Sequence, residues 1–268
     1  MADEIVPGVW RLHETRGCNV YLLRARDGRL VLVDTGFPSS AAGILRELTR
    51  LAPGEALAAI LITHGHFDHA GAAGALRSTG TSVFAGRGDT RLLPDGRRVI
   101  APQIGRTHLA RRLLGRRMEG SLAIVDVALD GEVEVVPGIR AVPVPGHTPG
   151  SYCYIDEDRG IAFAGDLVIS HEDRLSRAMT FANADDARYL RSLAEFAERS
   201  PGIGCPGHGI PVLCGFDEQL RELAAMPRRS LLSPSAMLDR ARRLRSFGTQ
   251  LSTVRRHPNS DSHPPKQS

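Results

Sequence analysis

The chain has 268 residues, of which 42% are hydrophobic and 24% charged, so it is long enough for one large globular domain or two small ones. No stretch approaches the about 20 apolar residues that a membrane-spanning helix needs, and the start MADEIVPGVW has neither the basic nor the apolar part of a secretory signal. The formal net charge is only +4, and the composition therefore predicts a cytoplasmic globular protein rather than a membrane protein.

Arginine supplies nearly all of the positive charge, because Lys266 is the only lysine. The arginines gather between Arg87 and Glu119 and again from Arg228 to Arg256, where they could contact an anionic partner or form a solvated basic surface. The four cysteines contain no CxxC pair, which favours reduced thiols over a disulfide framework. Cys205 lies near a candidate site, where we interpret it as a small buried residue.

Short β-branched runs bounded by Gly, Pro and Asp predict strands along most of the chain. They are residues 29–34, 57–63, 81–86, 131–146, 151–156 and 160–166. Apolar residues at three- and four-residue spacing predict helices over residues 39–51, 184–199 and 215–226. Strands and helices that alternate in this way predict a mixed fold, with helices covering sheets on their outer sides.

Two arginine-rich segments stand apart from this series. Residues 87–120 interrupt the strands with only a loose apolar pattern, which predicts a basic lid or insertion. Residues 227–256 include a serine-proline helix start and predict a basic C-terminal helical extension. Residues 257–268 are polar and proline-rich, so we expect a disordered tail. The expected organisation is one domain over residues 1–226 with these additions.

The densest group of potential metal ligands is THGHFDHAG, which follows the apolar run ALAAILI. Since alternate side chains of a strand share one side, His64 and His66 can enter one site if the strand continues that far. Asp68 and His69 follow in the predicted turn, before a run of small residues that favours a helix packed closely on the sheet. Imidazole and carboxylate are ligands of zinc, iron and manganese, so the motif indicates two half-complete metal sites. An adventitious surface histidine tract is the alternative.

A metal site needs donors from more than one loop, and three others follow the same pattern. In each, an apolar run is followed by a small residue that permits close backbone approach and then by a donor. They are His147 in VPVPGHTPGS, Asp166 in FAGDLV and His208 in GCPGHGIP. We therefore expect these donors to complete the two sites.

The set HGHFDH, PGHTPGS, AGD and PGHG, with the earlier VLVDTG, resembles the metallo-β-lactamase superfamily from about Val6 to Met226. The resemblance implies an α+β fold, a four-layer αβ/βα sandwich with metals at one edge between the sheets. It implies one metal bound by His64, His66 and His147, a second bound by Asp68, His69 and His208, and Asp166 as the bridge between them. Asp34 would orient ligands.

Two divalent ions held in this way would leave a net positive site that attracts anionic or oxyanion-forming substrates. A bound metal lowers the pKa of water from 15.7 to about 7, so a bridging hydroxide could attack a carbonyl carbon or a phosphorus. Asp68 would orient the nucleophile or carry its proton, which makes Asp68 and Asp166 the predicted catalytic residues. His171 is a candidate acid for the leaving group, with an ordinary surface histidine as the alternative.

The predicted function is hydrolysis of an ester, thioester or lactone of a small molecule by two divalent metals, zinc first and iron or manganese as alternatives. Glyoxalase II-like members share the ligand set, but LVISHEDRLSRAM lacks their arginine- and glycine-containing signature. Lactonase-like members resemble the chain too, and place a tyrosine shortly after the bridging aspartate. The nearest tyrosine here is Tyr189.

Three alternatives stay open at this point. A phosphodiesterase or nuclease would use two metals and basic surfaces, but aromatic residues are only 5% of the chain, so nucleic acid is not the expected partner. A mononuclear-iron sulfur dioxygenase is the second. A structural metal site is the third, although such sites prefer cysteine-rich shells. We expect arginines within residues 106–117 to hold an anionic substrate group, and the C-terminal helix could instead form a homodimer through Met237, Leu244 and Leu251.

Overall fold

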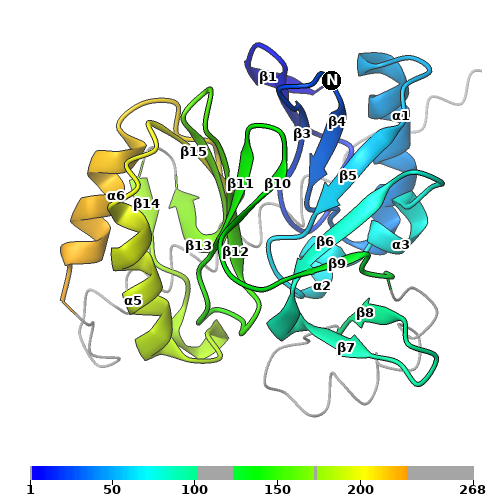
Figure 1. Ribbon diagram of the computed structural model, residues 1–268. Helices are drawn as coiled ribbons and strands as arrows, with labels where there is room; N and C mark the ends of the chain where they lie inside the picture. The colour runs from blue at the N-terminus through cyan, green and yellow to red at the C-terminus, as the bar shows by residue number, and fades with distance from the viewer. Residues whose placement is uncertain (1, 102–122, 172–173, 228–268) are drawn as a thin grey trace, which may run out of the picture. The chain divides into compact units, whose positions relative to one another are not determined.

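The computed structural model describes three stretches of the chain, residues 2–101, 123–171 and 174–227 (Figure 1). The chain divides into two units, Met1–Ala225 and Met226–Ser268, and every described helix and strand belongs to the first. Among the described residues, no helix combines the length and the apolar character that crossing a membrane requires.

Seven strands form the first sheet in the order β1-β2-β3-β4-β5-β6-β9. Their bounds are β1 Asp3–Val6, β2 Val9–Leu12, β3 Val20–Arg24, β4 Leu30–Val33, β5 Leu57–Leu61, β6 Ser82–Gly86 and β9 Val127–Leu129. Each neighbouring pair from β1 through β4 is antiparallel, and each neighbouring pair from β4 through β5 and β6 to β9 is parallel. The carboxyl ends of the parallel strands therefore share one edge, where the loop after β5 begins.

Six strands form the second sheet, in the order β10-β11-β12-β13-β14 with β15 beside β13. Their bounds are β10 Val133–Val136, β11 Ile139–Pro143, β12 Tyr152–Asp156, β13 Ile161–His171, β14 Arg174–Ser176 and β15 Ile203–His208. Only β15 runs parallel to its neighbour. The described part of the predicted basic lid contains a separate two-stranded sheet of β7 (Thr90–Leu92) and β8 (Arg98–Ile100); the rest of the lid lies outside the described residues.

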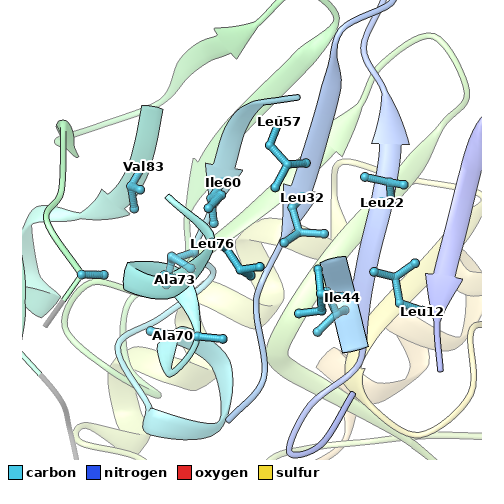
Figure 2. Packing of buried hydrophobic residues seen from close by; sticks show 14 of the residues in the cluster. Leu12, Leu22, Leu32, Ile44, Leu57, Ile60, Ala70, Ala73, Leu76 and Val83 are labelled. Atoms are coloured by element: carbon cyan, nitrogen blue, oxygen red, sulfur yellow. The ribbon is translucent and has the colours of Figure 1, made fainter. Parts of the chain in front are cut away.

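Helices cover the outer face of each sheet (Figure 1). These helices are α1 (Ala41–Leu51), α3 (Ala73–Leu76), α5 (Asp186–Ala197) and α6 (Phe216–Ala225). The other described helices are short and lie in the connections: α2 (Phe67–Ala70), η1 (Pro38–Ser40), η2 (Arg87–Asp89) and η4 (Thr180–Ala182). Ile44 of α1 and Leu76 of α3 pack with Leu32 and Ile60 of the first sheet (Figure 2). A separate cluster joins α5 and α6 to the second sheet.

Alternation along the strands builds a third core between the two sheets. In β3, Leu22 belongs to the cluster under α1 and α3, whereas Tyr21 and Leu23 belong to a cluster shared with the second sheet. Phe163 of β13 and Tyr154 of β12 reach the shared cluster from the other side. The layers are thus helix, sheet, sheet, helix, and the predicted αβ/βα sandwich is confirmed.

Several details differ from the sequence prediction. Strands β1, β2 and β3 were not predicted. Strand β3 escaped prediction because it is buried on both faces and shows no alternation of polar and apolar residues. The helix expected over residues 70–78 is reduced to α3, Ala73–Leu76, and a second four-residue helix, α2, precedes it and includes His69. Asp166 lies inside the long strand β13 rather than after a strand, and His208 is the last residue of β15 rather than part of a turn.

Candidate metal centre

Three imidazoles meet beyond the end of β5 and form what we call the first donor group, His64, His66 and His147. Strand β5 ends at Leu61, so His64 and His66 lie in a loop and not on an extended strand as predicted. His64 Nε2 nevertheless lies 2.9 Å from His66 Nδ1, and His147 Nε2 lies 3.1 Å from the same atom. Nitrogens bound to one tetrahedral zinc lie about 3.3 Å apart, because each Zn–N bond is about 2.0–2.1 Å. The spacing therefore fits a shared metal.

The second donor group consists of Asp68, His69 and His208. Asp68 and His69 lie in α2 rather than in a turn, and His208 comes from the second sheet at the end of β15. His69 Nε2 and His208 Nε2 are 3.3 Å apart, and His208 Nε2 is 3.5 Å from Asp68 Oδ2. The three donor atoms lie within 4.8 Å of one another, which again fits one ion.

Asp166 lies between the two donor groups and presents one carboxylate oxygen to each. Its Oδ1 is 3.3 Å from His69 Nε2 and 3.6 Å from His208 Nε2, while Oδ2 is 3.4 Å from His147 Nε2. Oδ1 is buried and accepts no hydrogen bond in good geometry from the described residues. Burying such a carboxylate oxygen costs free energy unless a cation compensates its charge, so the arrangement fits a residue that bridges two metals.

Asp34 contacts His69 of the second donor group directly and reaches His64 of the first through Thr63. Its Oδ2 lies 2.8 Å from His69 Nδ1, which places the ring proton on Nδ1 and leaves Nε2 to face the site. The carboxylate also accepts hydrogen bonds from the backbone N–H and the hydroxyl of Thr63. That hydroxyl lies 3.1 Å from His64 Nδ1, so a chain of contacts runs from Asp34 to His64.

Asn183 orients His147 in a similar way, and no sequence pattern indicated this residue. Asn183 Oδ1 lies 3.0 Å from His147 Nδ1, and its Nδ2 donates to Asp186 Oδ1 at 2.8 Å. Because the amide nitrogen already faces a carboxylate, the amide oxygen must be the atom that accepts from the imidazole. His147 therefore presents Nε2 to the site.

A second asparagine holds the loops of the second donor group. Asn19 Nδ2 donates to the carbonyls of Pro206 and Gly209, on either side of His208, at 3.0 and 2.7 Å. Its backbone N–H donates to Gly207 O, and the preceding N–H, from Cys18, donates to Asp68 O. One short segment before β3 thus binds both α2 and the end of β15, which carry this group.

The protonation states suit metal ligands in the first group more than in the second. Burial lowers the pKa of His66 to about 4, and burial together with neighbouring imidazoles lowers that of His64. Burial opposes ionisation of Asp68, but His69 and His208 outweigh it and hold its pKa at about 2. For His208, burial is outweighed by Asp166 and Asp68, which raise the pKa. A proton consequently competes with a metal at His208.

The remaining candidates lie apart from the seven donors. Cys205 packs in the core between the sheets, and the cysteine beside the site is Cys18, whose thiol lies near Asp34 and His69. Burial raises the pKa of Cys18 to about 11, so it is a neutral thiol. His171 ends β13 and belongs to neither donor group. The Tyr189 hydroxyl is buried, donates to Leu167 O and accepts from Ala178 N–H, so it supports the backbone after Asp166.

The model of one protein family matches residues 13–208, which is most of the chain and includes all seven donors. The family is described as the metallo-beta-lactamase superfamily. This chain belongs to the metallo-β-lactamase superfamily. The predicted resemblance is therefore confirmed, and the described residues include His/Asp groups able to hold metal ions.

Curated proteins and solved structures resemble the chain over most of its length. "Probable metallo-hydrolase YflN" of Bacillus subtilis (strain 168) is 28% identical over 232 residues, which cover 77% of this chain and 86% of that protein. The metallo-beta-lactamase family protein TTHA1429 of Thermus thermophilus superposes with a TM-score of 0.60 at 20% identity, covering 93% of this chain and 84% of that one.

The metallo-beta-lactamase FIM-1 of Pseudomonas aeruginosa, solved in a mono-zinc form, superposes with a TM-score of 0.58 at 22% identity. The match covers 84% of this chain and 94% of FIM-1. Both solved structures share the fold of this superfamily member.

Proposed function

We propose that the chain is a dinuclear metal-dependent hydrolase that cleaves an ester, thioester or lactone bond of a small molecule. One observation carries the proposal: the two oxygens of Asp166 face different donor groups, so a single carboxylate can serve two ions. Histidine and carboxylate donors without a cysteine in either group are typical of a catalytic site rather than a closed structural one. Zinc is the first expectation for both ions, with iron or manganese as alternatives.

Bound divalent ions would supply a nucleophile from water at neutral pH and a Lewis acid for the developing oxyanion. The chain's own residues prepare the site for this chemistry. His64 and His66 are neutral at neutral pH and Asp68 is ionised, which are the forms that bind metal. Asp166 fixes the separation of the two groups.

Asp68 is the residue of the site best placed to act on the reacting water as well. Its side chain is 28% exposed, compared with 11% for Asp166 and 5% or less for His69 and His208. We infer that one oxygen of Asp68 binds metal while the carboxylate orients the nucleophile or accepts its proton. Asp68 and Asp166 are therefore the proposed catalytic residues.

Elemental analysis of the purified full-length chain tests the proposal directly. The wild type should hold about two zinc ions, and His147→Ala and Asp166→Asn should each hold fewer. Asp156→Asn is the matched control, because Asp156 is also a buried carboxylate but binds Arg159 and no ligand loop. A preparation with no metal in any form of the chain would contradict the proposal.

Activity assays then separate the reaction classes. The metal-loaded wild type should hydrolyse simple esters, thioesters or lactones, and Asp166→Asn should abolish this activity. Preference for a phosphodiester such as bis(4-nitrophenyl) phosphate would favour a phosphodiesterase instead. A single iron per chain with oxygen-dependent sulfur oxidation would favour the dioxygenase alternative.

Two finer proposals concern segments outside the described residues. We propose that Arg111 and Arg112 hold an anionic group of the substrate, so their replacement by alanine should raise KM for anionic substrates and spare neutral ones. An equal effect on both substrate types would contradict this. A homodimer through Met237, Leu244 and Leu251 stays a proposal, which size measurements on a chain truncated at Arg228 would test.

A further inference from the structure

Asp89 is a buried carboxylate beside the metal centre that belongs to none of the donor groups found among the described residues. It is the last residue of η2, directly after β6, and only 1% of its surface is exposed. A buried carboxylate is costly unless several donors compensate its charge. The contacts of Asp89 therefore indicate what the structure uses it for.

The Asp89 carboxylate joins the two loops that carry the first donor group. Its Oδ2 accepts from the backbone N–H of Gly65 at 2.7 Å and from the Thr148 hydroxyl at 2.6 Å, and Oδ1 accepts from Gly150 N–H at 2.9 Å. Gly65 lies between His64 and His66, and Thr148 directly follows His147. Each of these three donors is thus within three residues of a proposed ligand.

The joined loops come from different sheets. The loop of His64 and His66 follows β5 in the first sheet, and the loop of His147 follows β11 in the second. A metal bound by all three imidazoles requires the sheets to keep a fixed separation at this edge. Hydrogen bonds from both loops to one carboxylate supply that constraint without a metal.

The backbones of both loops lie close to Asp89, so this residue determines the distance between the two loops. A Cβ on Gly65 would lie 3.0 Å from Asp89 Cβ, and a Cβ on Gly150 would lie 2.5 Å from Asp89 N. The two loops therefore contact η2 through glycine backbone at these points, where no side chain can repack. Loss of a hydrogen bond to Asp89 would be felt directly in the position of the ligand loops.

We propose that Asp89 is a positioning residue that holds His64 and His66 at the correct distance from His147 and thereby sets the metal affinity of the first donor group. This rests on the proposed function, since it assumes that the group binds a metal. In this role Asp89 acts through Gly65, Thr148 and Gly150 rather than by touching metal or substrate.

The test is a zinc titration of the full-length chain in competition with a chromogenic chelator. In Asp89→Asn, one acceptor oxygen becomes an NH₂ group, so at least one loop donor faces another donor. Changes in groups that orient ligands typically weaken metal binding about 10- to 100-fold, and we expect that loss for one of the two zinc ions. Thr148→Val removes one of the three hydrogen bonds to the Asp89 carboxylate, together with the contact between the Thr148 hydroxyl and Ser151 Oγ, and should give a smaller loss at the same ion.

Asp156→Asn is the matched control, because it neutralises a carboxylate of equal burial that contacts no ligand loop. It should lower the melting temperature of the metal-free chain and leave both zinc affinities unchanged. If Asp89→Asn behaves in the same way, Asp89 is merely structural and the proposal is overturned.

Thr148→Val keeps the test decisive if Asp89→Asn fails to fold, because it leaves the carboxylate and its bonds to Gly65 and Gly150 in place. Unchanged zinc affinity in a folded Thr148→Val chain would then overturn the proposal. If the wild type binds no zinc, the proposed function fails and this inference fails with it, whereas two tight ions in every variant refute the role of Asp89 alone.

Discussion

The two donor groups hold their ligands by different means. In the first group all three donors are imidazoles, and side-chain acceptors of Asn183 and Asp89 bind their loops. In the second group a carboxylate joins two imidazoles, and carbonyl groups of the ligand loops accept hydrogen bonds from a segment before β3. Neutral imidazoles bind protons weakly but attract a cation less strongly, whereas the negative carboxylate of the second group favours both a metal ion and a proton nearby. The two groups should therefore lose metal under different conditions.

The largest effect should come from Asp34→Asn, because Asp34 serves both groups. Its carboxylate binds His69 directly and reaches His64 through the Thr63 hydroxyl. An asparagine would place an NH₂ group against one of these donors, so we expect both metals to be lost. The free energy of unfolding of the metal-free chain should fall by about 1.5–3 kcal/mol, the usual value of a hydrogen bond to a buried charge.

Elemental analysis and urea unfolding of the metal-free chain would measure the two effects of Asp34→Asn. Thr63→Val is the companion variant, since it removes the hydroxyl that links Asp34 to His64 but leaves the direct contact between His69 and Asp34 and the backbone N–H of residue 63 in place. Retention of two metals in Asp34→Asn at wild-type stability would show that Asp34 orients neither group.

Acidification should remove one metal before the other. Asp166 and Asp68 overcome the effect of burial and raise the pKa of His208, whereas burial lowers the pKa of His66 to about 4. As pH falls through the raised pKa of His208, a proton occupies the nitrogen that faces the metal, while His66 stays neutral until about pH 4. The second group should thus empty first.

Zinc content after equilibration across pH 4 to 7 would check this order. Asp68→Asn supplies the contrast, because without that carboxylate the pKa of His208 should be less raised and its metal more resistant to protons, although weaker at neutral pH. Loss of both ions in one step, or earlier loss from the first group, would contradict the comparison.

Local sequence indicates candidate metal donors better than the residues that contact them. HGHFDH places four potential donors within six residues, so they stand out without knowledge of the fold. Asn183 is 36 residues from His147, and Asn19 is 187 residues from Pro206, so only the folded sheets bring these partners together. Nothing in the neighbouring sequence of either asparagine distinguishes it from an ordinary loop or strand residue.

The fold shows the same division between local and long-range information. Helix α1 has a clear apolar face, and its predicted end at Leu51 agrees with the structure. Strand β3 was missed because the sheets bury both of its faces, so its apolar run lacks a period. The small residues after His69 suit one continuous helix, but α2 ends at Ala70 and α3 begins only at Ala73. A periodic pattern of apolar residues therefore identifies an element that is buried on one face, but it is absent from an element that is buried on both faces.

Asn183→Ala should affect the first donor group alone. His147 would lose the acceptor that fixes its ring, while the backbone bonds of the loop, Ala184 N–H to His147 O and Asp185 N–H to Gly146 O, would remain. We expect zinc affinity at this group to fall about 10- to 100-fold with little change in global stability. The measurement is zinc titration in a His208→Ala background, in which the second group is disabled. Equal zinc affinity of the first donor group with and without the Asn183 side chain would show that Asn183 has no role in metal binding.

Asn19→Ala should give the smallest effect, and at the second donor group alone. The variant removes the amide donations to Pro206 O and Gly209 O, yet Asn19 N–H still binds Gly207 O and the Tyr21 hydroxyl still binds Pro206 O at 2.8 Å. Since part of the turn stays fixed, zinc affinity should fall by about tenfold at most. Titration in a His147→Ala background isolates this group, and each asparagine variant serves as the control for the other. If Asn19→Ala weakened the first group as much as the second, the two groups would form one mechanical unit, and the independence assumed for the pH order would also be lost.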